Sequence, residues 1–204
     1  MRTKSILIAA VIAIFALQTG AQAKGAKSVS VNCSLPATSV QGAVDGVTPG
    51  VPTTIFVVGE CTEDVTITSD AITLSGDPNG LGLRGGDGTI NGQISVIGAN
   101  NVTIENLTVT GSGAGVVVQD SANVHIRDSI LDENEFEGVA VINAAFVEIG
   151  GTNITDNWPN GSGLVVQRNS AAVLVCNNVI TGNGANNGRA IFLEELCLNL
   201  GDGV

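Results

Sequence analysis

The sequence is poor in basic and aromatic residues, and both shortages limit what the protein can bind. It has 8 Lys and Arg against 19 Asp and Glu, which gives a formal net charge of −11 at pH 7. So acidic a surface should repel nucleic acid and anionic lipid, and we expect no nucleic-acid partner. The chain has no Tyr, one Trp and five Phe. This is little aromatic surface for an extended sugar-binding groove.

Ligands for a zinc-type metal site are also scarce. His125 is the only His, it is far in sequence from each of the four Cys, and no Cys-x-x-Cys pair occurs. These features argue against a metal site built from Cys and His.

The N-terminus has the features of a secretory signal. Arg2 and Lys4 make its start positive, Ile6 to Leu17 is nearly all apolar, and Ala21-Gln22-Ala23 supplies a small-x-small cleavage site. The apolar stretch is too short to span a bilayer, although an uncleaved anchor is the alternative. We expect cleavage near Ala23 and a secreted or periplasmic protein whose net charge falls to −13 when Arg2 and Lys4 are removed. No later segment is long and apolar enough to be transmembrane.

One pattern recurs four times between residues 101 and 193. Each copy has the form apolar-x-apolar, with a third apolar residue seven places after the first, and the starts are 22, 23 and 26 residues apart. Alternation with period two indicates strands, and a repeat of this length indicates one coil of a solenoid. The predicted inward-facing core is Val102, Ile104, Val109, Val124, Ile126, Leu131, Val147, Ile149, Ile154, Val173, Val175 and Ile180.

Each coil also has a second short strand and two recurrent turn positions. The second strands are Val116–Val118, Val139–Val141, Leu164–Val166 and Ile191–Leu193. Asn tolerates left-handed backbone angles, and its amide can bond to the coils above and below. The two turn positions read Asn106, Asp128, Gly151, Asn177 and Ser112, Asn134, Asn157, Asn183.

Over roughly residues 53 to 200, this pattern resembles the right-handed parallel β-helix of the pectin-lyase-like superfamily. The resemblance implies an all-β, single-stranded right-handed parallel β-helix of about five or six coils. That fold hosts lyases, hydrolases, epimerases, phage tail proteins and adhesins, so it does not imply one activity. The Asn-Thr-Asp and Gly-His-Gly motifs of polygalacturonases and the Asp-Pro-His-Glu motif of mannuronan epimerases are absent, as is the Arg-x-Pro-x-x-Arg pattern of pectate lyases.

A short helix is predicted before the coils. Ser39 can cap it, and Val40, Ala43 and Val44 form an apolar stripe at helical spacing. Such a helix would cover the open N-terminal end of the solenoid, whose end coil otherwise exposes core and strand edges. We therefore divide the chain into a signal peptide, an N-terminal segment with the cap, and a β-helix domain, at residues 1–23, 24–52 and 53–204.

The even number of Cys in an exported chain favours disulfides. Cys33 lies just before the coils and Cys61 lies on the first one, whereas Cys176 and Cys197 are 21 residues apart, nearly one coil. Residues one coil apart lie on neighbouring rungs, within reach of a disulfide if their register matches. We predict the bonds Cys33–Cys61 and Cys176–Cys197, with free thiols as the alternative.

Charged residues are expected to meet on the outside of one sheet. With the coils in register, Glu105 lies beside Arg127, and His125 lies beside Glu148. This group could bind a sugar acid, with Arg holding a carboxylate and His or Arg taking a proton. Ordinary cross-strand charge pairing is the simpler interpretation, and we favour it.

Two further features could bind ligands. An acidic run could hold calcium, as acidic side chains do in the pectate lyases of the superfamily that the pattern resembles, although a solvated acidic loop is the simpler interpretation, and we favour it. Trp158 lies in an inserted loop and could stack on a sugar or cover its own coil. The acidic run consists of Asp128, Asp132, Glu133, Glu135 and Glu137.

The outward positions of the second strands form an apolar ribbon: Val117, Ala140, Val165 and Phe192. Four stacked apolar residues tend to mark a contact. We expect the N-terminal segment 24–34, a loop or a second molecule to cover them, which makes a homo-oligomer a further expectation. The alternative is that the ribbon stays wet, because valine simply favours strands.

These features together favour an exported, non-catalytic β-helix protein that binds a glycan, or a protein, at the cell surface. One alternative is a small or degenerate polysaccharide lyase acting on acidic polysaccharide. Another is a structural part of a larger assembly. No cofactor other than calcium is suggested.

Overall fold

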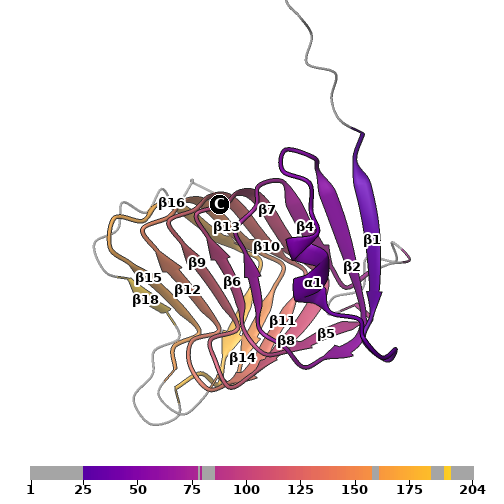
Figure 1. Ribbon diagram of the computed structural model, residues 1–204. Coiled ribbons are helices and arrows are strands. Elements are labelled where there is room, and N and C mark those ends of the chain that lie inside the picture. The colour runs from indigo at the N-terminus through magenta and orange to yellow at the C-terminus, as the bar shows by residue number, and fades with distance from the viewer. Residues whose placement is uncertain (1–24, 78, 80–85, 158–160, 185–190, 194–204) are drawn as a thin grey trace, which may run out of the picture.

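The computed structural model describes residues 25–77, 79, 86–157, 161–184 and 191–193. In this part of the chain nearly all regular structure is short strands, stacked side by side in three walls (Figure 1). Sheet A consists of β1 (Lys27–Asn32), β2 (Thr53–Cys61), β4 (Ile72–Ser75), β7 (Asn100–Glu105), β10 (Ala122–Arg127), β13 (Ala145–Gly150) and β16 (Ala171–Cys176).

The other two walls complete each coil. Sheet B consists of the end of β2, β5 (Gly88–Asn91), β8 (Leu107–Gly111), β11 (Ile130–Asn134), β14 (Asn153–Thr155) and β17 (Val179–Thr181). Sheet C consists of β3 (Val65–Ile67), β6 (Ile94–Ile97), β9 (Val116–Gln119), β12 (Val139–Ile142), β15 (Leu164–Gln167) and β18 (Ile191–Leu193). The single α-helix among the described residues is α1 (Val40–Asp45).

Equivalent residues of successive coils pair in parallel register. Val124 pairs with Val102 on one side and with Val147 on the other, and Ile126 pairs with Ile104 and Ile149. Because side chains alternate across a strand, these residues all point to the same side, into the space that the three walls enclose. The predicted all-β parallel β-helix is therefore confirmed.

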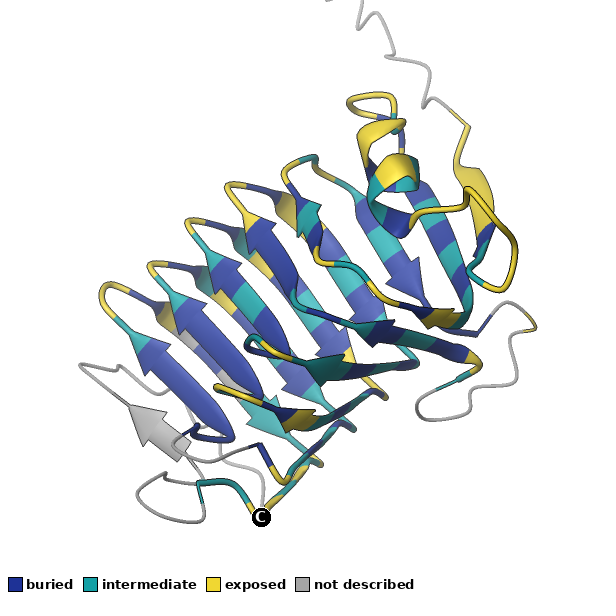
Figure 2. Cartoon of the chain, turned by 60° about the horizontal axis from the view of Figure 1, so that its bottom comes forward, coloured by how far each residue is buried: buried dark blue, intermediate teal, exposed yellow. Residues whose placement is uncertain are grey.

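The core consists of these inward columns. Ten of the twelve predicted core residues are buried, and Val175 and Ile180 in the last described coil are partly buried against the same cluster. Figure 2 shows the buried positions as continuous bands that run from strand to strand along the stack. The core is aliphatic throughout, since stacked Val, Ile and Leu fill the narrow interior and favour strands.

Both predicted turn positions behave as expected. At the first, Asn106, Asp128, Gly151 and Asn177 have left-handed backbones with φ of 53°, 50°, 62° and 54°. At the second, the amide of Asn134 donates to Asn157 at 2.8 Å, and the amide of Asn157 donates to Asn183 at 2.8 Å. Asn134 and Asn157 are completely buried. This ladder links the buried turns by hydrogen bonds from coil to coil and ends at Asn134, whose buried Oδ1 has no partner among the described residues.

The predicted cap is confirmed, and it is held by Ser39, as expected, and by Glu63, which sequence reasoning missed. The Ser39 hydroxyl accepts from the Gly42 N–H and donates to Glu63, whose carboxylate also accepts from the Val40 and Gln41 N–H groups. These bonds occupy the free donors of the first helical turn. Val40 and Val44 are buried against the first coils.

The Gln41 side chain hydrogen-bonds to the outer edge of β3, as the backbone of a neighbouring strand would. Its side-chain oxygen accepts from the Thr66 N–H at 2.6 Å, and its amide nitrogen donates to the Thr66 carbonyl at 3.2 Å. The edge of sheet C is thereby closed at this point, as edge strands usually require. The helix α1 is too short to cross a membrane, and no other helix is present in the described ranges.

The N-terminal segment lies elsewhere than one expectation placed it. Strand β1 pairs with β2 in parallel and extends sheet A, so it does not cover the apolar ribbon of sheet C. Val29 and Val31 continue the inward columns of Ile55 and Val57. The segment pairs with β2 because its apolar and polar residues alternate. This alternation lets β1 point its valines toward the core and add one more strand to sheet A.

The first predicted disulfide is present. Cys33 follows β1, Cys61 ends β2, and their sulfurs are bonded with the Cα atoms 5.2 Å apart. Cys176 has no disulfide partner among the described residues, and Cys197 lies outside them. The pairing of Cys176 with Cys197 therefore stays a prediction.

Candidate functional site

The outward face of sheet A brings together the charged residues that the repeat predicts. Arg127 Nε and Nη2 lie 2.8 and 2.7 Å from Glu105 Oε2, and His125 Nδ1 lies 2.9 Å from Glu148 Oε2. Strand β10 supplies His125 and Arg127, β7 supplies Glu105, and β13 supplies Glu148. The predicted neighbours are therefore confirmed as direct contacts.

Strand register is the cause of these contacts. His125 is paired with Glu148, and Arg127 is paired with Glu105, in the parallel ladders on either side of β10. Val124 and Ile126, which alternate with these two residues along β10, are buried and point inward. Residues opposite one another in neighbouring strands lie close enough for their side chains to interact.

Amide side chains continue this row of hydrogen bonds. Asn123 Oδ1 lies 3.2 Å from His125 Nε2, and Asn123 Nδ2 donates to Asn101 Oδ1 at 2.6 Å. The His125 ring is thus fixed from both of its nitrogens, by Asn123 and by Glu148. Asn101 and Asn123 have left-handed backbones with φ of 58° and 55°, a conformation that Asn tolerates well.

Phe146 stands at the same position one coil further on, and sequence reasoning missed it. It lies between Ala145 and Val147, which pair with the residues on either side of Asn123. Its backbone is left-handed, with φ of 54°, and its side chain is 66% exposed. The available signal was the break in the column, where Asn101 and Asn123 are followed by an aromatic residue.

This face offers a polar, hydrogen-bonded surface that includes the exposed aromatic side chain of Phe146. The side chains of His125 and Glu148 are 34% and 46% exposed, and those of Arg127 and Glu105 are 56% and 19% exposed. A ring beside amide, imidazole and carboxylate groups can stack on a ligand while the polar groups bond to its hydroxyls. A proton-transfer role for His125 is less well served, because both of its ring nitrogens are already hydrogen-bonded, one to Glu148 and the other to Asn123.

The acidic run does not form a cation cage. Among the described residues, Cys33, Cys61 and Glu63 form the sole group of three potential metal ligands, and the two sulfurs form the disulfide. Asp132 accepts instead from the Thr155 hydroxyl at 2.8 Å. The remaining members are Asp128, Glu133, Glu135 and Glu137, of which the first three are exposed. The calcium expectation gains no support from this arrangement.

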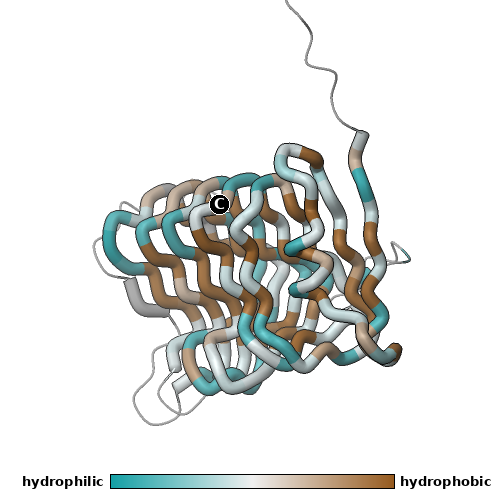
Figure 3. The backbone as a smooth tube through the Cα atoms, in the orientation of Figure 1, coloured by the Kyte–Doolittle hydropathy of each residue, from teal (hydrophilic) through white to brown (hydrophobic). Residues whose placement is uncertain are grey.

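The apolar ribbon of sheet C is far less exposed than the sequence suggested. Val117 is half-buried, and Ala140 and Val165 are 7% and 5% exposed in a single copy of the chain. Figure 3 shows hydrophobic colour running through successive strands of this wall. The side chain of Phe192 and the whole of Trp158 lie outside the described residues. An interface role for the ribbon stays a prediction.

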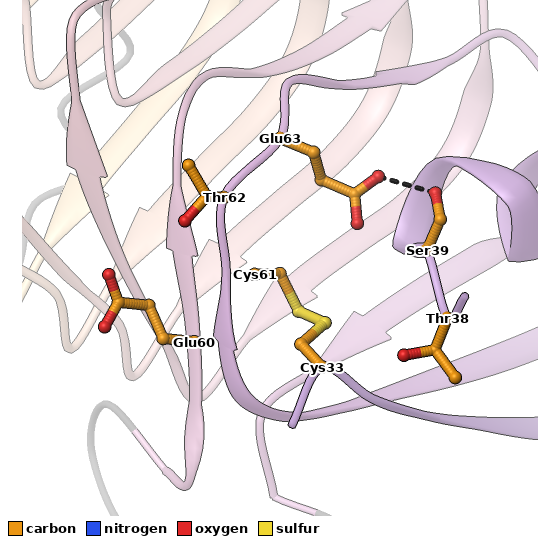
Figure 4. A pocket seen from close by; sticks show the side chains of 7 residues that line it. All are labelled: Cys33, Thr38, Ser39, Glu60, Cys61, Thr62 and Glu63. Atoms are coloured by element: carbon orange, nitrogen blue, oxygen red, sulfur yellow. Dashed lines mark hydrogen bonds between the residues drawn. A yellow bond between two sulfur atoms is a disulfide. The ribbon is translucent and has the colours of Figure 1, made fainter. Parts of the chain in front are cut away.

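Two open cavities lie at the N-terminal end and use none of the predicted catalytic residues. One, of about 450 Å³, is lined by the Cys33–Cys61 disulfide, Ser39 and Glu63, with Thr38, Glu60 and Thr62 (Figure 4). In this view Glu63 points to Ser39, its capping partner. The other, of about 370 Å³, is lined by Pro49, Gly50, Thr68, Ser69, Asp70, Gly98 and Asn100.

Residues 92–199 match the family model described as "Right handed beta helix region". Comparison with curated proteins found no match, and comparison with solved structures found none either. The match covers the coils from the end of β5 onward, including the whole of the His125 face.

Proposed function

We propose that this chain, which belongs to the right-handed β-helix family, is an exported, non-catalytic protein that binds a glycan through the outward face of sheet A. One observation carries the proposal. Phe146, whose side chain is 66% exposed, occupies the position of Asn123 one coil further on and precedes Glu148 by two residues on β13, so it adjoins a hydrogen-bonded row of amide, imidazole and carboxylate groups. Sugars need both kinds of contact, a flat apolar surface for the ring face and polar partners for the hydroxyls.

The row is already ordered before any ligand binds. Asn101, Asn123, His125 and Glu148 hold one another by hydrogen bonds on three neighbouring strands of a rigid stack. Polar groups that are fixed in advance lose little conformational freedom on binding, and this favours affinity. The exposed carboxylate and amide oxygens can still accept bonds from sugar hydroxyls.

Charge on this face favours a neutral or basic glycan over a polyanion. Arg127 is bound to Glu105, His125 is bound to Glu148, and Asp128 lies exposed in the next turn. The whole chain carries a formal charge of −11. An acidic polysaccharide would therefore approach against the field of the protein.

Export is supported by the disulfide between Cys33 and Cys61, since such bonds persist mainly in oxidising compartments. Export also agrees with the signal-like sequence of the N-terminus. Mass spectrometry of the protein from the culture medium or periplasm should give a chain that starts at Lys24. A cytoplasmic, uncleaved chain would contradict this part of the proposal.

The binding test is a glycan array followed by affinity measurements on Phe146→Ala. Loss of a stacked ring should weaken binding about three- to tenfold, corresponding to ~0.5–1.5 kcal/mol. The matched control is Phe136→Ala, because Phe136 is 56% exposed and lies between β11 and β12, away from sheet A. Equal effects of the two substitutions, or no glycan bound by the parent chain, would contradict the proposal.

A lyase remains the second candidate because His125 and Arg127 lie on one strand, each with a carboxylate beside it. Its test is the release of unsaturated products from acidic polysaccharides in the presence of calcium. Turnover that is lost in His125→Ala or Arg127→Ala would show catalysis and overturn the non-catalytic proposal. The proposal expects no turnover with either the parent chain or the variants.

A further inference from the structure

The N-terminal edge of sheet A is open among the described residues. Strand β1 is the outermost strand at this end, and its first four residues are exposed (Figures 1 and 2). The edge of sheet C at the same end is closed by Gln41, whereas no described residue pairs with the outer side of β1. At this end of the stack, a side chain therefore occupies the edge of sheet C, whereas no described residue occupies the edge of sheet A.

The register shows which backbone groups point outward. Lys27 N donates to Pro52 O, and Cys33 N donates to Val58 O, so the odd-numbered residues of β1 bond to β2. In a parallel ladder every second residue turns its N–H and C=O groups to the other side. Ser28 and Ser30 therefore present both groups outward, and Asn32 presents its N–H, because its carbonyl already accepts from Leu35 and Thr38.

From this edge we infer that β1 pairs in antiparallel fashion with β1 of a second copy of the chain. With Ser30 opposite the partner's Ser30, the two residues exchange N–H···O bonds, and each Asn32 N–H reaches the partner's Ser28 carbonyl. The same register places Val29 opposite the partner's Val31. Val29 faces the core side of the sheet but is 40% exposed at this open end, so the second copy would cover it.

Symmetry and charge favour a second copy as the occupant. A two-fold pairing of identical edges closes on itself and leaves neither β1 edge free, which ends the assembly at a dimer. Residues 25–34 contain Lys27 and no acidic side chain, in a chain of net charge −11. Two copies therefore meet where their mutual repulsion is weakest.

The test compares Ser30→Pro with Ser30→Thr by analytical ultracentrifugation of the purified protein over a wide concentration range. Proline at position 30 removes an outward N–H and no bond to β2, and edge strands accept proline at such positions. The parent chain and Ser30→Thr should double in mass as concentration rises, whereas Ser30→Pro should remain a monomer. At dilutions where the parent is also a monomer, Ser30→Pro should have the same melting temperature as the parent.

Amide hydrogen exchange gives a second readout that needs no variant. The Ser30 and Asn32 amides, which donate across the proposed interface, should exchange more slowly at high than at low concentration. A parent chain that stays monomeric would overturn the inference, and so would Ser30→Pro dimerising as the parent does. Protection of these amides in a monomer would also overturn it, because a segment of the same chain would then occupy the edge.

Discussion

Sheets A and C are both built from short strands of alternating residues in parallel register, yet their outward faces differ in polarity and in exposure. Sheet A exposes the Arg127–Glu105 ion pair, the His125–Glu148 hydrogen bond, an amide row and the side chain of Phe146. Sheet C presents Ser95, Val117, Ala140 and Val165, which are buried or half-buried. Inward positions must be apolar in both walls, so only the outward positions are free to carry a function.

Cover on sheet C is visible at its N-terminal part. The Gln93 side chain donates to Ser95 Oγ at 2.7 Å and accepts from the Ala114 N–H at 3.1 Å, so it lies over the strand rather than in solvent. No side chain in the part of the chain that the structure describes lies comparably over His125 or Phe146, whose side chains are 34% and 66% exposed. The repeat thus determines which residues of a strand point outward, whereas nearby side chains determine whether those residues are accessible to a ligand.

The largest effect should come from Ile126→Asp, which places a charge in the core between the walls. Ile126 is completely buried, so the substitution should lower the free energy of unfolding by about 4 kcal/mol. The matched control is Thr103→Asp, at an outward and half-buried position of sheet A, with an expected loss under ~1 kcal/mol. Urea denaturation of both variants checks this, and equal midpoints would refute the inward assignment.

An intermediate effect should separate the two outward faces directly. Ala140 on sheet C is only 7% exposed, so in Ala140→Lys the new charged side chain must either be buried or push its neighbours aside. The substitution should lower the free energy of unfolding by about 2 kcal/mol. Thr103→Lys on sheet A should change the free energy of unfolding by less than ~0.5 kcal/mol, because its side chain can extend into water. If thermal or urea unfolding gives equal losses for the two variants, the faces do not differ in cover.

The smallest effect concerns the turn that joins the two faces, between β9 and β10. Asp120 lies in this turn and accepts a hydrogen bond from Asn143, which lies in the equivalent turn one coil further on, between β12 and β13; this bond is the main reason that the pKa of Asp120 is lowered from its ordinary value. A carboxylate with a lowered pKa stabilises the fold above its ordinary pKa, and that contribution is lost as the pH falls through the lowered value.

Removing the Asn143 amide should therefore raise the pKa of Asp120 back toward its ordinary value. An NMR titration of Asn143→Ala measures the shift. Asn101→Ala is the control, because the Asn101 side chain contacts Asn123. An unchanged titration of Asp120 in Asn143→Ala would show that its other hydrogen-bond donor, Gln119, is sufficient by itself.

Contacts between repeats could be predicted from the sequence, and contacts outside the repeat could not. The pairing of His125 with Glu148 and of Arg127 with Glu105 follows from counting one coil along the chain, since a stacked coil gives each outward residue one neighbour on either side. Glu63 binds the first turn of α1, and Gln41 binds Thr66, but neither contact recurs from coil to coil, so counting repeats could not predict them. These contacts depend on where one particular turn places the chain.

The sequence by itself determined the stacked strands, the inward core and the left-handed turns, because a period of two and a repeat of one coil leave a single arrangement that buries the apolar residues together. Only the tertiary structure decided the exposure of Phe146, the burial of Ala140 and Val165, and the open edge of β1. Those properties depend on which segments cover which face. Cover is set by the packing of non-repeating segments against the stack, for which an alternating pattern holds no information.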